Sequence, residues 1–437
     1  MESSGVDTWV VYTPRMTARL TYIIQTVLPG VTVTDSKEKI PEYGKYCLNY
    51  SAEIIAGSFR ILPHDLLLQT GITAQPIQIS YWEELPVFFQ TEGDLPFDIF
   101  AAAFYLLSRY EEYLPHTLDQ YGRYSHTNSL AYKEGFLKQP LVNLWLKKLS
   151  QKLRQFTHDS RFTIHDSRFR FIPTYDIDEA FSYLHKPLWK NVLGFYRDLL
   201  QGKFEQVIER GNVYSGRKKD PYDTFDWIDS LHEKFGLEPI YFLLTILKRG
   251  VYDKNLSAYS KALQQLYRSS AAKNTIGLHP SWQSGTEQGL LEKEKSFLQK
   301  IIRQPVTTSR QHYLRFTLPD TYRRLLAAGM TDEYSMAYGA VNGFRASYCL
   351  PFYWYDLAKE TTTTLRIHPF CFMEASSFFN QGYTALQAAE EIQYYHDVVK
   401  EVNGEFITLF HNHFLTEQPQ WKEWREMYEA FLLKNFG

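Results

Sequence analysis

The alternation of hydrophobic and polar positions predicts a different arrangement of strands and helices before and after about residue 160. The chain opens with a predicted strand at residues 8–12. Thr13 and Pro14 are the residue types expected at the N-cap and first position of a helix that runs to Leu28. A second short strand is predicted at residues 31–34. This order indicates a small α/β domain, and because no glycine-rich loop follows the first strand, we expect no phosphate cradle there.

A strongly apolar helix is predicted at residues 98–112. Its apolar side chains recur at helical spacing, at Ile99, Ala102, Ala103, Leu106 and Tyr110. We expect Arg109, Glu111 and Glu112 to form the polar edge of this helix. A further amphipathic helix follows at residues 141–153, and the polar segment 157–160 reads as a linker. The pattern therefore predicts a first domain at residues 1–160.

After this boundary, predicted strands alternate with helical patterns. The candidate strands are residues 168–178, 238–245, 274–279, 307–314, 331–337, 364–372 and 405–411. Seven strand–helix units in succession predict a barrel of parallel strands at residues 165–437. In such barrels the chemistry gathers at the carboxyl ends of the strands, so side chains able to bind ligands should fall there.

Acids and histidines do follow the predicted strands. Asp176 and Asp178 stand two apart at the end of the first one, so they should point to the same face. Two carboxylates on one face repel each other, and a bound cation is a common compensation. The histidines that follow the other strands are His279, His312, His368 and His411. A solvated pair of acids is the alternative for the first strand alone, but histidines at several corresponding ends favour one shared site.

Composition narrows the function classes only slightly. Hydrophobic residues make up 44% of the 437 residues and charged residues 22%, as in ordinary globular proteins. A net charge of −2 provides no basic surface for nucleic acid. The three cysteines are far apart, which favours a reducing compartment. With neither a signal peptide pattern nor an apolar run long enough to span a bilayer, we expect a cytoplasmic protein.

Aspartate and histidine ligands without cysteine favour a hard or borderline divalent cation, with zinc expected and manganese, cobalt or nickel left open. Such a cation lowers the pKa of a bound water and polarises a carbonyl. A free carboxylate can then act as general base and a histidine as general acid. This set of groups suits hydrolysis of an amide or ester, and the chain has no G-x-S-x-G elbow for a serine nucleophile.

Four segments resemble motifs of the polysaccharide deacetylases (carbohydrate esterase family four, which includes the nodulation-type chitooligosaccharide deacetylases). The segments are Thr174-Tyr-Asp-Ile-Asp178, Gly277-Leu-His-Pro-Ser281, Ser309-Arg-Gln-His312 and Leu409-Phe-His411. The resemblance implies Asp176 as general base and Asp178 and His279 as metal ligands. It implies Arg310 as the arginine that orients the base and His411 as general acid.

This chain departs from the family pattern at two places. The second motif carries another histidine ligand four residues after the first, where this chain has Gln283. His312 is the candidate for the missing imidazole. The Arg-x-Pro-Tyr of the third motif is also absent.

The resemblance implies a distorted (β/α)7 barrel, and the first domain resembles an uncharacterised module attached to deacetylase-like chains in some bacteria. We therefore expect a metal-dependent hydrolase that removes N-acetyl or O-acetyl groups from a glycan or glycan precursor. The alternatives are an inactive carbohydrate-binding or scaffold protein, which Gln283 favours, and a metal-dependent hydrolase of another bond. Candidates for substrate contacts are Arg345, Trp282 and His368.

Overall fold

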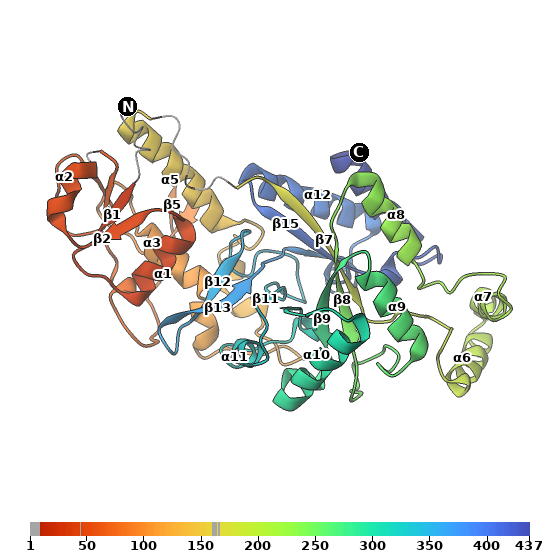
Figure 1. Cartoon of the computed structure of the whole chain (residues 1–437). Coiled ribbons are helices and arrows are strands. Elements are labelled where there is room, and N and C mark those ends of the chain that lie inside the picture. Colours follow the sequence, from red (N-terminus) through yellow and green to blue (C-terminus); the bar gives the residue numbers. More distant parts are fainter. Residues whose placement is uncertain (1–8, 44, 160–163, 165–166) are drawn as a thin grey trace, which may run out of the picture.

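The computed structural model in Figure 1 describes residues 9–43, 45–159, 164 and 167–437. The N-terminal part holds a four-stranded parallel sheet with the order β2-β1-β3-β4 and a separate antiparallel hairpin, β5-β6. The strands are β1 Val10–Tyr12, β2 Thr32–Thr34, β3 Cys47–Asn49, β4 Phe59–Arg60, β5 Ser80–Trp82 and β6 Leu85–Val87. The helices are α1 Ala18–Val27, α2 Ile40–Tyr43, α3 Ile99–Leu107, α4 Leu130–Lys133 and α5 Leu141–Thr157.

The first helix begins later than the sequence pattern predicts. Its N-cap is Thr17, whose hydroxyl accepts a hydrogen bond from the Leu20 amide at 3.1 Å, so the prediction of Thr13 as N-cap was wrong. The Thr13 hydroxyl instead donates to the Arg15 carbonyl within a turn before the helix. Thr8 and part of the predicted linker lie outside the described residues, and the division into two domains stays a prediction.

The C-terminal part contains a nine-stranded sheet with the order β12-β13-β11-β10-β9-β8-β7-β15-β14. All of its neighbours are parallel except the antiparallel pair β12-β13. The strands are β7 Arg170–Ile177, β8 Ile240–Thr245, β9 Thr275–Pro280, β10 Thr308–Ser309, β11 Asp332–Glu333, β12 Phe352–Asp356, β13 Thr361–Ile367, β14 Phe372–Met373 and β15 Glu405–His411. The predicted α/β fold with a parallel sheet is confirmed.

The sheet differs from the predicted barrel in its closure. Among the described residues, β12 and β14 are its two edges and share no hydrogen bonds, so the ring stays open there. The predicted strands at 307–314 and 331–337 shorten to two residues each. At the first of these the chain leaves the sheet in a tight turn, where Tyr313 and Leu314 take φ of 60° and 53°.

Helices alternate with the strands of this sheet along the chain and flank it (Figure 1). They are α6 Leu188–Leu200, α7 Phe204–Tyr214, α8 Phe225–Phe235, α9 Lys261–Ala271, α10 Gln288–Ile302, α11 Asp320–Ala327, α12 Ala385–Glu401 and α13 Lys422–Phe436. No helix of the described residues is both long and apolar enough to cross a bilayer.

A buried ion-pair network joins the N-terminal part to the large sheet. Arg109 contacts Glu111 and Glu112 at 2.7 Å, and Glu112 binds Arg345 at 2.6 Å. Arg109, Glu111 and Glu112 were predicted to form the polar edge of a helix at residues 98–112. In the structure α3 ends at Leu107, and the three residues follow it, buried in this network. Burial by itself raises the pKa of Glu112, but the guanidinium groups of Arg345 and Arg109 lower it to about 2.

We expect Glu112→Ala to destabilise the protein by about 3–5 kcal/mol, because the buried Arg345 loses its carboxylate partner and the buried Arg109 loses one of its two. Since the folded pKa of Glu112 lies below its value in the unfolded chain, its stabilising effect is full above about pH 5 and is lost as the pH falls toward 2. Urea unfolding of wild type and Glu112→Gln should show their difference narrowing over that range. Glu401→Ala, which breaks the exposed pair with Lys147, is the control and should change little.

Candidate functional site

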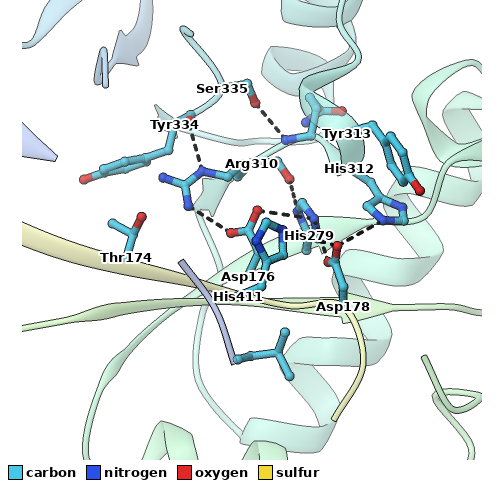
Figure 2. A network of polar contacts seen from close by, with 12 residues as sticks. Thr174, Asp176, Asp178, His279, Arg310, His312, Tyr313, Tyr334, Ser335 and His411 are labelled. Atoms are coloured by element: carbon cyan, nitrogen blue, oxygen red, sulfur yellow. Dashed lines mark hydrogen bonds and ion pairs between the residues drawn. The ribbon is translucent and has the colours of Figure 1, made fainter. Parts of the chain in front are cut away.

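Five side chains from four strand ends converge in the large sheet, as Figure 2 shows. They are Asp176 of β7, Asp178 directly after β7, His279 of β9, His312 after β10 and His411 of β15. In the sheet register His411 lies beside Asp176, and His279 lies two strands away on β9. The parallel register therefore brings together residues that are far apart in the sequence.

Asp178, His279 and His312 form a group able to hold a metal ion. Their candidate donor atoms lie within 4.8 Å of one another. Nε2 of His279 is 3.2 Å from Oδ1 of Asp178, and Nε2 of His312 is 3.5 Å from Oδ2. Oδ1 of Asp178 is buried and accepts no hydrogen bond. A carboxylate and two imidazoles facing one point, with a buried oxygen left open, fit a divalent cation.

The electrostatics of Asp178 favour its charged form. Burial by itself raises the pKa of Asp178, but the neighbouring imidazoles of His312 and His279 hold it well below its usual range. The carboxylate is therefore ionised at neutral pH, as a metal ligand must be.

A partner at Nδ1 orients each of the two imidazoles of this group. Nδ1 of His279 lies 2.6 Å from the Arg310 carbonyl, and because a carbonyl can only accept, Nδ1 donates and Nε2 keeps its lone pair for the site. Nδ1 of His312 faces Oδ1 of Asp253 at 3.1 Å. Asp253 is itself held by the amides of Gly250 and Trp282. Such outer partners are typical of metal-binding histidines.

Gln283, which stands at the position of a family histidine, points elsewhere. Its amide nitrogen lies 3.5 Å from the Arg249 carbonyl, and it is not part of the candidate metal group. The second imidazole of that group belongs to His312, one strand along the sheet.

Asp176 is fixed by a buried arginine. Nη1 of Arg310 donates to Oδ1 of Asp176 at 2.9 Å, while its Nε donates to the Tyr334 carbonyl. The guanidinium lies over the rings of Phe242 and Phe370, with its centre 4.2 and 5.0 Å from theirs. Oδ2 of Asp176 is 3.6 Å from Nε2 of His279, so this second oxygen faces the candidate metal group.

His411 faces the same point from the other side. Its Nε2 is 3.6 Å from Oδ2 of Asp178, and its Nδ1 is 2.6 Å from Oε1 of Glu374. Burial by itself lowers the pKa of His411, but the charge and hydrogen bond of Glu374 raise it to about 9. His411 therefore carries a proton at neutral pH in this arrangement.

The cavity around these groups has a volume of about 440 Å³. Its lining includes the apolar side chains Leu314, Met373 and Leu409 and the aromatic side chains Tyr121, Tyr252, Tyr313, Phe379 and Phe414. His413 also lines it, and burial together with the charge of His411 lowers the pKa of His413 to about 3, so this imidazole is neutral. The cavity thus combines charged groups on one side with apolar and aromatic walls.

A loop of the N-terminal part supplies one wall of the cavity through Gln120, Tyr121 and Arg123. Arg123 is held by Asp119 at 2.7 Å and donates to the Tyr313 carbonyl at 2.8 Å. A Cβ atom at Gly339 would lie 1.9 Å from Nη1 of Arg123, so only glycine permits this approach. The cavity is therefore lined both by the N-terminal part and by the part that carries the large sheet.

The three residues predicted to contact substrate lie away from the lining. Arg345 is buried against Glu112 in the ion-pair network. His368 hydrogen bonds Asp332 at 2.8 Å and stacks on Tyr334. Trp282 packs behind the wall, with its ring centre 4.2 Å from that of Tyr252. None of the three is among the residues that line the described cavity.

Sequence reasoning missed Glu374, Asp253 and Arg123. Glu374 had a usable signal, since it directly follows the apolar pair of β14 beside β15. Asp253 and Arg123 lie in polar loops whose pattern carries no such signal.

Comparison with known proteins gives a partial family match. A family of unknown function (DUF7033) matches residues 9–158, and no curated protein matches the chain. Three similar solved structures are a Mycobacterium smegmatis protein assigned as a polysaccharide deacetylase, the Puue allantoinase and the polysaccharide deacetylase Bc1974 of Bacillus cereus. The first two are each 12% identical at a TM-score of 0.39, covering 62% and 61% of this chain and 84% of their own. The third is 10% identical at 0.31, covering 61% and 88%. These similarities are too low to assign an activity.

We expect Asp253→Asn to weaken zinc binding by roughly 10- to 100-fold, because His312 loses the carboxylate that orients it. Competition with a chromophoric chelator measures the affinity. The matched control is Asp332→Asn, which alters the acid that faces His368 outside the cavity and should leave zinc affinity unchanged. Equal affinities in both variants would contradict the placement of His312 in the metal group.

Proposed function

We propose that this protein is a metal-dependent hydrolase that removes an acetyl group from an N- or O-acetylated glycan or glycan precursor. The observation that carries the proposal is that the two carboxylates at the cavity have different partners. One carboxylate, Asp178, faces two imidazoles, while the other, Asp176, is held apart by Arg310. A protonated histidine, His411, faces both.

Asp178, His279 and His312 would hold the cation. A bound divalent cation supplies Lewis acidity, which polarises the acetyl carbonyl and makes water more acidic. Zinc suits one carboxylate and two imidazoles, and manganese, cobalt or nickel accept the same donors.

Asp176 is the proposed general base. Arg310 occupies one of its oxygens and fixes its orientation, so the other remains free to accept a proton from the attacking water.

His411 is the proposed general acid. Its Nε2 faces the cavity and can donate a proton to the nitrogen or oxygen that leaves with the sugar. Glu374 holds Nδ1 and so keeps the ring oriented and charged until that transfer.

The walls of the cavity suit an acetylated sugar. Its volume lies within the range of small-molecule sites. Leu314, Met373 and Leu409 offer an apolar surface for the acetyl methyl group, and the aromatic rings at the rim can pack on the faces of sugar rings. The earlier alternative of an inactive protein rested on Gln283. His312 offers the candidate metal group the imidazole that Gln283 lacks, which supports the active protein over that alternative.

The test separates the roles of the two aspartates. We expect Asp176→Asn to lower acetate release from an N-acetylated chitooligosaccharide by about 10²- to 10⁴-fold while the protein retains its metal. Asp178→Ala should lose both metal and activity, since a ligand is removed. Acetate release and the metal content of the purified variants are the measurements.

A chelator should abolish the activity of the wild type, and added zinc should restore it. Asp332→Asn again serves as the control and should keep both metal and activity. Loss of metal from Asp176→Asn with retention in Asp178→Ala would reverse the proposed roles, and wild-type protein that is loaded with metal but releases no acetate would refute the function.

A further inference from the structure

The helical pair α6–α7 exposes an unusual amount of apolar surface. Figure 1 shows the two helices projecting from the molecule at the end opposite the N-terminal part. Leu188 is 76% exposed, Trp189 and Leu193 are each 60% exposed, and Leu200 is 86% exposed. Other exposed apolar residues of the pair are Val192, Phe195, Tyr196, Leu199, Phe204, Ile208 and Tyr214. Contiguous apolar surface of this kind marks an interaction site.

The amphipathic pattern of α6 is reversed relative to an ordinary surface helix. At 3.6 residues per turn, its exposed apolar side chains cover an arc of about 160°. The inward face is polar: Asn191 and Asp198 are buried there and bind the buried Arg210 of α7 at 3.0 and 2.6 Å. Because polar contacts hold the two helices together, the apolar arc is left outside.

Exposed basic side chains border this apolar surface. Residues 188–214 contain four lysines and arginines against three acids, and the buried Arg210 pairs with Asp198. Lys190 and Arg197 lie at the border of the apolar arc on α6, and Lys203 lies between the helices. All three are exposed. Cations beside an apolar face with tryptophan and tyrosine are typical of helices that lie in a membrane interface.

We propose that the α6–α7 pair docks this protein on the surface of an anionic lipid bilayer. The apolar arc enters the boundary between headgroups and acyl chains, and the lysines and arginines bind the lipid phosphates. A symmetric contact between two copies would bring the exposed Lys190, Arg197 and Lys203 of one copy near those of the other, which disfavours self-association.

The docking surface lies next to the cavity in the structure. The α6–α7 pair follows Asp178 after a loop of nine residues, and a groove of about 1190 Å³ lies between the pair and the rest of the protein. Glu179 and Lys254 line both this groove and the cavity. The identity of the substrate rests on the proposed function. If that function holds, the substrate is an acetylated saccharide attached to a lipid.

The experiment is co-sedimentation of the full chain with vesicles of phosphatidylcholine alone or of equimolar phosphatidylcholine and phosphatidylglycerol. We expect the wild type to bind the anionic vesicles and to bind much less to the neutral ones. Trp189→Ser/Leu193→Ser and Lys190→Glu/Lys203→Glu should each weaken binding by at least roughly tenfold, because they remove apolar area and reverse charge. All four positions are exposed, so both variants should keep the thermal midpoint of the wild type.

The matched control is Leu386→Ser, at an equally exposed leucine of α12, which should bind as the wild type does. Absence of wild-type binding to anionic vesicles, or wild-type binding by both double variants, would overturn the proposal. So would a wild-type dimer in size-exclusion chromatography that Trp189→Ser/Leu193→Ser converts to a monomer, since the surface would then be a contact between copies.

Vesicle binding requires neither metal nor turnover. Vesicle binding without acetate release would support the docking surface and refute only the proposed function. Acetate release without vesicle binding would refute the docking surface and support the proposed function.

Discussion

The site depends on how the negative charges of two neighbouring carboxylates, Asp176 and Asp178 at the end of β7, are each compensated. Two carboxylates at close range repel each other, and this repulsion calls for a compensating group beside each of them. The fold provides it separately, with Arg310 beside Asp176 and imidazoles around Asp178. Because each acid has its own partner, one is left to bind a cation and the other to accept a proton, and the proposed chemistry follows from that separation.

The rest of the site maintains this arrangement. A backbone carbonyl holds His279, and the carboxylates of Asp253 and Glu374 hold His312 and His411. In each case Nδ1 is occupied, so Nε2 of every ring faces the cavity. The orientation of three imidazoles is thus set by groups that themselves lie outside the reacting centre.

The N-terminal part is tied to the large sheet by buried charges and also reaches into the cavity. Glu112 and Arg345 join the two parts, and Arg123 lies against Gly339 in the wall of the site. Contacts of this kind make the N-terminal part a component of the proposed active site, in addition to any separate role it has. At the opposite end, the α6–α7 pair carries the apolar and basic surface proposed to bind lipid.

The sequence by itself determined the elements whose signals are local. The period of two placed Asp176 and Asp178 on one face, and apolar runs ending in histidine located β9 and β15. Only the tertiary structure decided which polar residues are partners, because they are far apart in the chain: Arg345 lies 233 residues from Glu112, and Asp253 lies 59 residues from His312. Hydrophobic periodicity records the face on which a side chain lies. Hydrophobic periodicity does not indicate which charged group that side chain contacts, because this depends on how distant strands and loops pack together.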